Sequence, residues 1–593
     1  MRQAKEVPEK PNNFSATWIK LIQYSRAHWI GLLFAVVLAA GGNILTVLAP
    51  NQLSKMTDVI STGMNTSIDM EAVRTIGFTL LGLYGFSGLF NLIQGWIMVS
   101  VTQNISKKLR SDISDKINRL PMAYFSKTTV GDTLSRVTND VDTIGRALNM
   151  SVQNLLSSGT MMIGSLVMML LTNGWMTLTA ISATGIGLLL MGLIMGSSQK
   201  YFVQQQSHLG AINGQIEETY SGHTIVKAYN GEGIVREDFT KMNEMLRDSG
   251  FKAQALSGLM MPIMTFMGNF GYLAVSVVGG LLTINGTISF GVVVAFIIYV
   301  RYFTQPLAQI AQAVQSLQSA AAAGERVFDM LEEEEMAPED HKTKRLGEIK
   351  GQVEFSDVQF SYEESAEPVI KHFSATVEPG QKIAIVGHTG AGKTTIVNLL
   401  MRFYEIDQGD ITIDGVSIQD IPKDNLHEQF VMVLQDTWVF EGTVRDNLVY
   451  NTAEVTEDEL VDASRAVGID HFIRTLPEGY DTVLDEKANL SHGQKQQLTI
   501  ARAIIADKPM IILDEATSSV DTRTELKIQE AMDMLMEGRT TFVIAHRLST
   551  IRDADTILVM DEGDIIESGS HVELMAQNGF YTDLYNSQFD QTP

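Results

Sequence analysis

The sequence KIAIVGHTGAGKTTIVNLL, residues 382–400, contains the clearest fold signal in the second half of this chain. An apolar run typical of a buried strand leads into a glycine-rich turn, and an apolar helical pattern begins directly after the turn. The turn satisfies the pattern G-x-x-x-x-G-K-[ST] from Gly387 to Thr394. Chance can produce an eight-residue match, but the strand before it and the helix after it indicate a phosphate-binding loop.

Each residue type in this loop suits the binding of a nucleoside triphosphate. Glycines allow backbone N–H groups to curl around phosphate at the N-terminus of the following helix. The lysine of the pattern reaches the β and γ phosphates, and the hydroxyl after it ligates Mg²⁺. We therefore expect ATP and Mg²⁺ as cofactors, with Thr394 on the metal and the nucleotide bound by Gly387, Gly390, Gly392, Lys393, Thr394 and Thr395.

A second apolar run, MIILDE at residues 510–515, ends in two carboxylates. A continuous apolar strand fits a parallel sheet covered on both faces, in which ligands bind beyond the carboxyl ends of the strands. We expect Asp514 to hold Mg²⁺ and Glu515 to act as the catalytic base for the attacking water. Short strand patterns alternate with helical patterns around both motifs, which predicts an α/β P-loop ATPase domain over residues 350–593.

Charge divides the chain of 593 residues into two unlike halves. Residues 1–330 hold 23 Lys and Arg against 19 Asp and Glu, whereas residues 331–593 hold 21 against 50. The acidity of the second half argues against nonspecific binding of nucleic acid. The chain has no cysteine, which excludes a disulfide framework. The first residues lack the pattern of a cleaved signal peptide, so we expect membrane insertion to depend on internal segments.

Long uncharged runs in the first half predict membrane-spanning helices. A spanning helix needs about 20 residues. The runs contain 28, 32, 53 and 48 residues, and lie between Arg26 and Lys55, Arg74 and Lys107, Arg146 and Lys200, and Lys252 and Arg301. The first two runs hold one helix each and the last two hold two each, which gives six spans. The eight Lys and Arg of residues 107–146 place that segment and both termini in the cytoplasm.

These patterns predict a membrane α-helical fold, with long cytosolic extensions at residues 107–146 and 200–252, followed by the cytosolic ATPase. In the N-terminal segment, Phe14, Trp18, Leu21 and Ile22 lie near one helical face and suggest an interfacial helix, with a solvated lead-in as the alternative. The expected boundaries are residues 1–26 for the N-terminal segment, 27–330 for the transmembrane domain, 331–349 for a solvated linker and 350–593 for the nucleotide-binding domain.

The sequence LSHGQ, residues 490–494, completes a familiar order of motifs. Together with the phosphate loop and the MIILDE strand, it resembles the nucleotide-binding domain of the ATP-binding cassette (ABC) family, and six spans before that domain resemble a half-size exporter. The segments 124–142 and 218–232 resemble the loops that dock on the ATPase domains in this family. Carried over by position, the resemblance implies that Tyr362 stacks on adenine, Gln435 senses the γ-phosphate and Mg²⁺, Asp521 lies at a dimer seam, His546 contacts the γ-phosphate, and Ser491, Gly493 and Gln494 bind nucleotide.

The resemblance implies an ATP-driven export pump of the bacterial cell membrane that works by alternating access as one half of a dimer. Its nearly charge-free spans fit hydrophobic or amphipathic substrates of the multidrug type, and lipids or hydrophobic peptides would suit the same surface. A nucleotide-gated channel or regulatory subunit is the alternative from another class of function. The expected partners are a second half-transporter, the lipid bilayer and the transported compound, without nucleic acid.

His492 departs from the LSGGQ sequence that is usual in the family. The residues before it, with Asp485, Glu486 and Lys487, also differ from the usual glycine- and glutamate-containing run. Replacing glycine by histidine should remove backbone freedom and add bulk near a phosphate. In the family, the signature of one chain, here residues 490–494, meets the phosphate loop of the other chain. The chain resembles the subunit of heterodimeric bacterial multidrug exporters, with one strong and one weak site, that supplies the catalytic carboxylate. We therefore expect a heterodimer whose second chain has a more regular signature. A homodimer that tolerates the substitution is the alternative.

Overall fold

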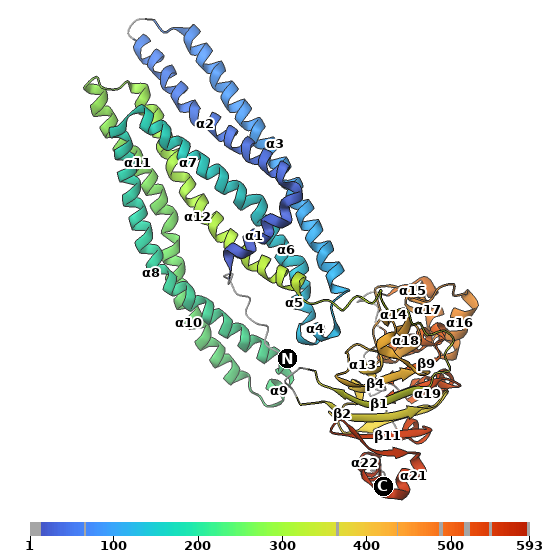
Figure 1. Ribbon diagram of the computed structural model, residues 1–593. Helices are drawn as coiled ribbons and strands as arrows, with labels where there is room; N and C mark the ends of the chain where they lie inside the picture. Colours follow the sequence, from blue (N-terminus) through green and yellow to red (C-terminus); the bar gives the residue numbers. More distant parts are fainter. Residues whose placement is uncertain are drawn as a thin grey trace. The chain divides into compact units, whose positions relative to one another are not determined.

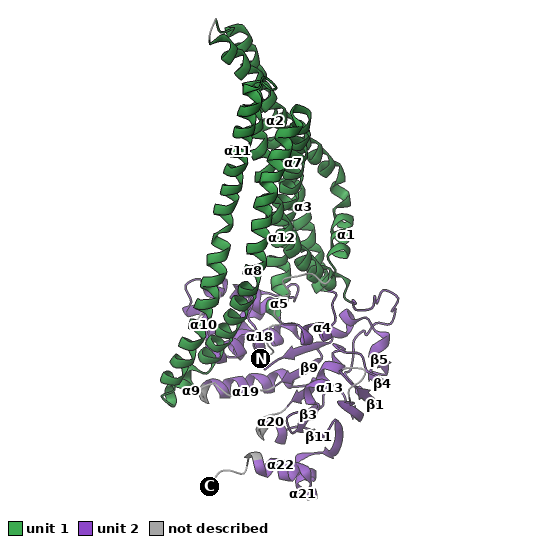
Figure 2. Cartoon of the chain, turned by 90° about the vertical axis from the view of Figure 1, so that its left-hand side faces the viewer, with its two compact units in different colours: residues 1–118, 130–333 green, residues 119–129, 334–593 purple. Residues whose placement is uncertain are grey.

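A computed structural model describes residues 13–64, 67–362, 367–435, 437–484, 490–514, 522–544 and 548–589. The chain forms two compact units (Figure 2): the first contains residues 1–118 and 130–333, and the second contains residues 119–129 and 334–593.

The first unit is helical (Figure 1). Its helices are α1 (Phe14–Tyr24), α2 (Trp29–Gly63), α3 (Met70–Ile117), α5 (Val130–Ser135), α6 (Val141–Arg146), α7 (Val152–Thr172), α8 (Gly174–Ser221), α9 (His223–Ala228), α10 (Glu232–Gly258), α11 (Met260–Ile284) and α12 (Phe290–Glu332). A 3₁₀ turn, η1 (Ser25–His28), and two π turns, η2 (Arg136–Asp140) and η3 (Ala147–Ser151), connect some of them.

Six helical segments among the described residues are long and apolar enough to cross a membrane. This number confirms the count made from the uncharged runs. The predicted extensions are also present, because α8 continues to Ser221 and α10 begins at Glu232, with the short α9 between them (Figure 1). The other extension is interrupted: α3 ends at Ile117, and residues 119–129, with the short helix α4 (Met122–Lys127), group with the second unit.

Close packing of small residues holds the membrane helices together. At Gly291, at the start of α12, an added Cβ would lie 2.1 Å from the backbone oxygen of Ser54 in α2. The Asp58 carboxylate of α2 accepts hydrogen bonds from the Ser289 hydroxyl (2.7 Å) and the Gly291 N–H (2.8 Å). The beginning of α12 is therefore fixed against the end of α2. Met169 and Met176 are fully buried between the helices. Their flexible side chains fill gaps in the packing there.

The helix predicted near the N-terminus is present as α1, but its apolar residues divide between two surroundings. Leu21 is buried and packs beside Gly324 of α12, where an added Cβ would lie 3.5 Å from the Leu21 Cδ1 atom. Phe14 and Ile22 are exposed instead. One edge of α1 thus packs on α12 and the other edge is exposed, and the proposed place of α1 at a membrane surface stays a prediction.

The second unit is an α/β domain built on a six-stranded sheet of order β12-β11-β3-β10-β9-β6. Its strands are β3 (Lys382–Gly387), β6 (Phe430–Val433), β9 (Met510–Asp514), β10 (Thr540–Ile544), β11 (Thr556–Asp561) and β12 (Asp564–Gly569). All neighbouring pairs are parallel except β11 and β12. Ile512 and Val543 are buried, as expected for strands covered on both faces.

Smaller sheets and helices complete this unit. An antiparallel sheet has the order β2-β1-β4-β5, and β7 pairs with β8. These strands are β1 (Val353–Phe360), β2 (Ile370–Val377), β4 (Gln408–Ile413), β5 (Val416–Ser417), β7 (Gly442–Thr443) and β8 (Val483–Leu484). The helices are α13 (Lys393–Leu400), α14 (Lys423–His427), α15 (Val444–Val449), α16 (Glu457–Ala466), α17 (Asp470–Thr475), α18 (His492–Ala506), α19 (Thr522–Met536), α20 (Leu548–Arg552), α21 (His571–Gln577) and α22 (Phe580–Phe589), with 3₁₀ turns η4 (Ile418–Asp420) and η5 (Gly479–Asp481).

The segment after α12, expected to be a solvated linker, is anchored on the second unit. The Glu339 carboxylate pairs with Arg402 (2.7 Å) and accepts the N–H of Lys423 at the start of α14 (2.6 Å). The N–H of Leu346 donates to the side-chain oxygen of Asn425 (2.7 Å), and both residues are buried. The segment therefore follows α14 rather than running free.

Candidate nucleotide-binding site

The predicted phosphate-binding loop joins β3 to α13, as the sequence indicates. Gly387 has room only for hydrogen, because an added Cβ would lie 2.2 Å from the backbone oxygen of Met560 in β11. Gly392 has a left-handed φ of 97° and caps α13 without a side-chain hydrogen bond. The first N–H groups of α13 thus have no capping side chain, which suits a phosphate at this helix N-terminus.

Lys393 is folded into this loop. Its Nζ atom donates to the carbonyl oxygens of Gly387 (2.8 Å) and His388 (2.9 Å). Burial lowers the pKa of Lys393, and the negative charge of Asp514 opposes that shift. The cation is therefore held where the loop closes, with the Asp514 carboxylate near enough to act on it.

The sheet brings the predicted metal ligands to one edge. Asp514 is the last residue of β9, Leu513 pairs with Val433 of β6, and Gln435 follows that strand by two residues. Gln435 is exposed. The carboxyl ends of parallel strands share an edge, so Gln435 and Asp514 follow or end strands at the same edge of the sheet as the loop that precedes Thr394.

These side chains suit a Mg²⁺ ion that is shared with a bound nucleotide, rather than a metal ion whose ligands all come from the protein. Hydroxyl, amide and carboxylate oxygens are hard donors, and Mg²⁺ is usually held by one or two carboxylates together with substrate phosphates. No cluster of three or more His, Cys, Asp or Glu that could hold a metal occurs among the described residues. Thr394, Gln435 and Asp514 would therefore hold Mg²⁺ together with the nucleotide, and the bound ion would offset phosphate charge.

Tyr362 lies beside the loop through its hydroxyl group, which is 3.0 Å from the Thr395 hydroxyl. Its ring meets Phe360 and Tyr404 edge to face, with centroids 4.9 and 5.1 Å apart. Tyr362 is 41% exposed, so part of the ring stays accessible to a base. Tyr404 was not among the residues predicted from the sequence, because no local pattern links it to Tyr362.

Three predicted residues, Glu515, Asp521 and His546, lie outside the described residues, as do Asp485, Glu486 and Lys487 before the signature. Their roles stay predictions. Glu515 follows directly after Asp514 in the sequence.

The signature residues form the N-terminus of α18 rather than part of the phosphate loop. Ser491 caps this helix: its Oγ accepts the Gln494 N–H (3.2 Å), and the Gln494 side chain accepts the Ser491 N–H (2.8 Å). The Ser491 hydroxyl still has its own hydrogen to donate. The helix α18 packs chiefly on α15, α16, α19 and β6, whereas α13 packs on β3 and β10. The signature and the loop of one chain are therefore attached to different neighbours.

The backbone at His492 does not need the freedom that the histidine was expected to remove. His492 is the first residue of α18 and is exposed, and Gly493 follows it inside the helix. Neither residue has a positive φ. A histidine at this position therefore does not need the backbone conformations that only glycine adopts easily. It differs from the usual glycine in the bulk and the chemistry of its imidazole side chain.

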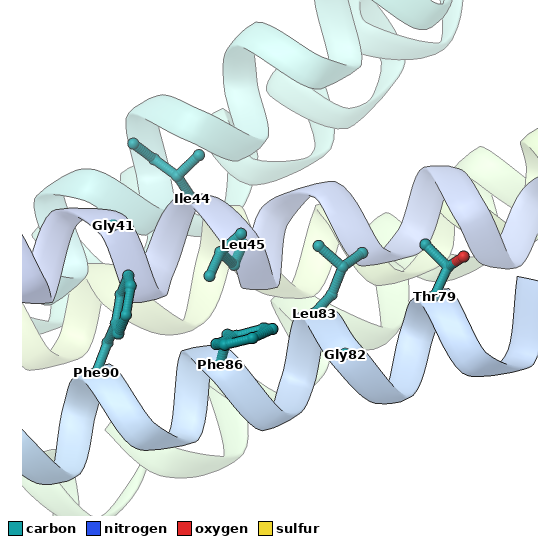
Figure 3. A pocket seen from close by; sticks show the side chains of 8 residues that line it. All are labelled: Gly41, Ile44, Leu45, Thr79, Gly82, Leu83, Phe86 and Phe90. Atoms are coloured by element: carbon teal, nitrogen blue, oxygen red, sulfur yellow. The ribbon is translucent and has the colours of Figure 1, made fainter.

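The membrane unit contains an apolar pocket between α2 and α3. Its volume is about 600 Å³, and side chains of α3 point toward α2 across it (Figure 3). Thr79 is its one polar side chain, and the lining residues are Gly41, Ile44, Leu45, Thr79, Gly82, Leu83, Phe86 and Phe90.

Comparison with known proteins agrees with both units. Residues 32–307 match the family model described as the ABC transporter transmembrane region, and residues 370–518 match the model described as ABC transporter. A fatty acid ABC transporter ATP-binding/permease protein of Mycobacterium tuberculosis is 46% identical over 529 residues, which cover 88% of this chain and 83% of the relative. An uncharacterized ABC transporter ATP-binding protein of Bacillus subtilis, YfiC, is 39% identical over 95% of this chain and 92% of its own length. A probable multidrug resistance ABC transporter protein of the same organism, YheH, is 36% identical over 86% of this chain and 76% of its own length.

Proposed function

Because this chain belongs to the ABC transporter family and joins a six-helix membrane region to an ATPase domain, as an exporter half-transporter does, we propose that it exports hydrophobic or amphipathic compounds. ATP hydrolysis in the cytoplasmic domain drives this transport across the cell membrane. The observation that carries the proposed substrate class is the apolar character of the membrane helices.

Two features of the membrane unit support this substrate class. Residues 147–199 and 253–300 contain no Asp, Glu, Lys or Arg. The α2–α3 pocket adds an apolar recess with two aromatic side chains, Phe86 and Phe90. Such surfaces gain about 25 cal/mol for each Å² of apolar area that a ligand removes from water, and give no charged partner to a polar solute.

Similarity to known transporters favours two of the substrate classes that fit this surface. Amphipathic drugs are the first, and the similarity to YheH favours them. Fatty acids or other lipids are the second, and the similarity to the mycobacterial fatty acid transporter favours them. An acyl chain needs the same apolar contacts as a drug but adds a polar headgroup that stays near the membrane surface.

Vesicles reconstituted with the complete dimeric transporter, with the ATPase domains outside, would test the proposal. We expect ATP-dependent accumulation of either a fluorescent lipophilic cation or a fluorescent fatty acid, and none for the Glu515→Gln variant. Competition by the unlabelled compound of each class decides between them. If ATP is hydrolysed but neither class accumulates, the proposed substrate class is wrong.

We also propose the assignment of the catalytic residues. Glu515 is the catalytic base, Gln435 and His546 contact the γ-phosphate, and Thr394 and Asp514 hold Mg²⁺ with Gln435. The closeness of Lys393 to Asp514 supports a single centre at the end of β3 and β9. The proposal is independent of which compound is transported.

The nucleotide site is proposed to be completed by a second chain. In support, the signature at the start of α18 and the phosphate loop at the start of α13 have different packing neighbours. We further propose that the second chain is a different half-transporter with a regular signature, since His492 puts an imidazole on the helix end that would meet the partner's nucleotide. The backbone conformation at His492 does not favour a heterodimer over a homodimer. The bulk of the His492 side chain is the only support for the heterodimer.

A further inference from the structure

The C-terminal helices α21 and α22 follow the last strand of the sheet and contain none of the residues assigned above. The start of α22 is held by Glu567 of β12, whose two carboxylate oxygens accept the N–H groups of Phe580 (2.6 Å) and Tyr581 (2.9 Å). A carboxylate at this place satisfies the first N–H groups of α22. Gly579 allows the approach, because an added Cβ would lie 2.0 Å from the Glu567 Oε1 atom.

A second anchor lies between the two helices. The Tyr581 hydroxyl is 2.7 Å from the His571 Nδ1 atom, and Tyr581 is fully buried. At the start of α21, Ser570 and Glu573 form a reciprocal capping pair. The first residues of α22 are therefore held from β12 and from α21 at once.

The sheet places this anchored end next to the phosphate loop. Glu567 of β12 pairs with Val559 of β11, and the next residue of β11, Met560, pairs with Gly387 of β3. One strand thus separates the residue that caps α22 from the first glycine of the loop.

Phe580, the first residue of α22, contacts the phosphate loop directly. Its ring meets the imidazole of His388 at an interplanar angle of 81°, with centroids 5.2 Å apart. His388 is the residue after Gly387, and its carbonyl oxygen accepts a hydrogen bond from the Lys393 Nζ atom (2.9 Å). The side chain of His388 is thus held by α22, and its carbonyl holds the lysine of the loop.

We infer that Phe580 is a positioning residue for nucleotide binding, which acts on the loop through His388. The inference rests on the assignment of residues 387–395 as the nucleotide loop. With the His388 ring fixed, the loop keeps the curvature that directs its N–H groups and Lys393 toward phosphate. Without Phe580 the loop samples other conformations, and ATP binding has to order it again.

The Phe580→Ala variant of the full chain, assembled with its partner in lipid, tests this role. An edge-to-face ring pair is worth enough to weaken ATP binding about three- to ten-fold when it is lost. We expect the Kd and KM for ATP to rise by that factor, with kcat unchanged, because the residues on the metal and the attacking water remain. Phe580→Tyr keeps the ring and should bind ATP as the parent does.

Val572→Ala is the matched control, since Val572 lies in α21 and is 76% exposed. It should leave both constants unchanged. A Phe580→Ala variant with unchanged KM, or with kcat and melting temperature reduced while KM stays constant, would refute the positioning role. If Lys393→Ala also leaves ATP affinity unchanged, the assignment of the nucleotide loop fails instead, so the two failures are distinguishable.

Discussion

Lys393 has two backbone carbonyls as partners in the structure, and a triphosphate offers it stronger ones. Hydrogen bonds between charged groups are roughly twice as strong as those to neutral acceptors. The exchange of the Gly387 and His388 carbonyls for phosphate oxygens therefore favours binding, provided the loop keeps its curvature.

Removal of this cation should weaken binding itself. We expect Lys393→Ala to reduce ATP affinity about ten-fold or more, because a charge-assisted bond to phosphate contributes about 1.5–3 kcal/mol. Titration of the full-length protein with a fluorescent ATP analogue measures the effect. Equal affinity of the variant and its parent would contradict the assignment of this lysine.

Glu515 should behave differently from Lys393, although both belong to one proposed centre. We expect Glu515→Gln to keep ATP affinity within about two-fold and to reduce turnover about 100-fold or more, since a general base contributes about 10²–10⁴ in rate. Binding and hydrolysis measured on the same preparation separate these effects. Parental turnover in the variant would remove Glu515 from the role of base.

Among the elements of the ATPase domain, the segment after α12 is joined to the turn after α13 through a nearly buried ion pair between Glu339 and Arg402, and to α14 through the hydrogen bond from the Lys423 N–H to Glu339. The side chain of Arg402 is 7% exposed and that of Glu339 is 18% exposed. Arg402 also donates to the Ile421 carbonyl (2.9 Å) and to Glu405 (2.9 Å). The short segment after α12, which has few apolar residues, is thereby held to the ATPase domain by an ion pair that solvent screens only weakly.

The pKa of Glu339 makes this connection dependent on pH. Burial alone would raise that pKa, but the hydrogen bonds from the Lys423 N–H and Lys342, together with the charge of Arg402, hold it below its ordinary value. The stability from Glu339 is therefore fully present above the pKa of the unfolded chain, near 4.3. It is lost as the pH falls through the lower pKa of the folded protein.

We expect Glu339→Gln to destabilise the ATPase domain by about 2 kcal/mol at pH 7, because Arg402 loses one of two carboxylate partners. The difference from the parent should shrink below about pH 4. Thermal melting between pH 7 and pH 3.5 measures this. Lys344→Ala is the control from the same segment: its pair with Asp420 (2.7 Å) is exposed, with an expected effect below about 1 kcal/mol. An equal loss in both variants would contradict the account.

The elements also show which parts of the site a sequence can reveal. The loop from Gly387 to Thr394 and the strand ending at Asp514 were predictable, because each depends on neighbours within a few residues. The six spans were predictable because a charge inside a bilayer is costly. The contacts of Tyr404 with Tyr362 and of Phe580 with His388 join residues far apart in the chain, and no local pattern announces them.

In the complete transporter, the effect of His492 depends on whether the two subunits are identical or different. In a homodimer, both nucleotide sites would meet a helix end that carries this histidine. In a heterodimer, one site would combine Lys393, Asp514 and Glu515 of this chain with the partner's signature, and the other would contain His492. The sites would then differ in turnover, because only one has both an intact catalytic set and a regular signature.

Expression of this chain alone decides between the two arrangements. We expect the lone chain to hydrolyse ATP at least about ten-fold more slowly than the complete transporter and to transport nothing, because each of its sites would then contain His492. His492→Gly in the lone chain should raise hydrolysis if the imidazole hinders the partner's phosphate, and should leave melting temperature unchanged, since position 492 is an exposed helix start. A lone chain that dimerises, hydrolyses ATP with substrate stimulation and transports would establish a homodimer, and the heterodimer proposal would then be wrong.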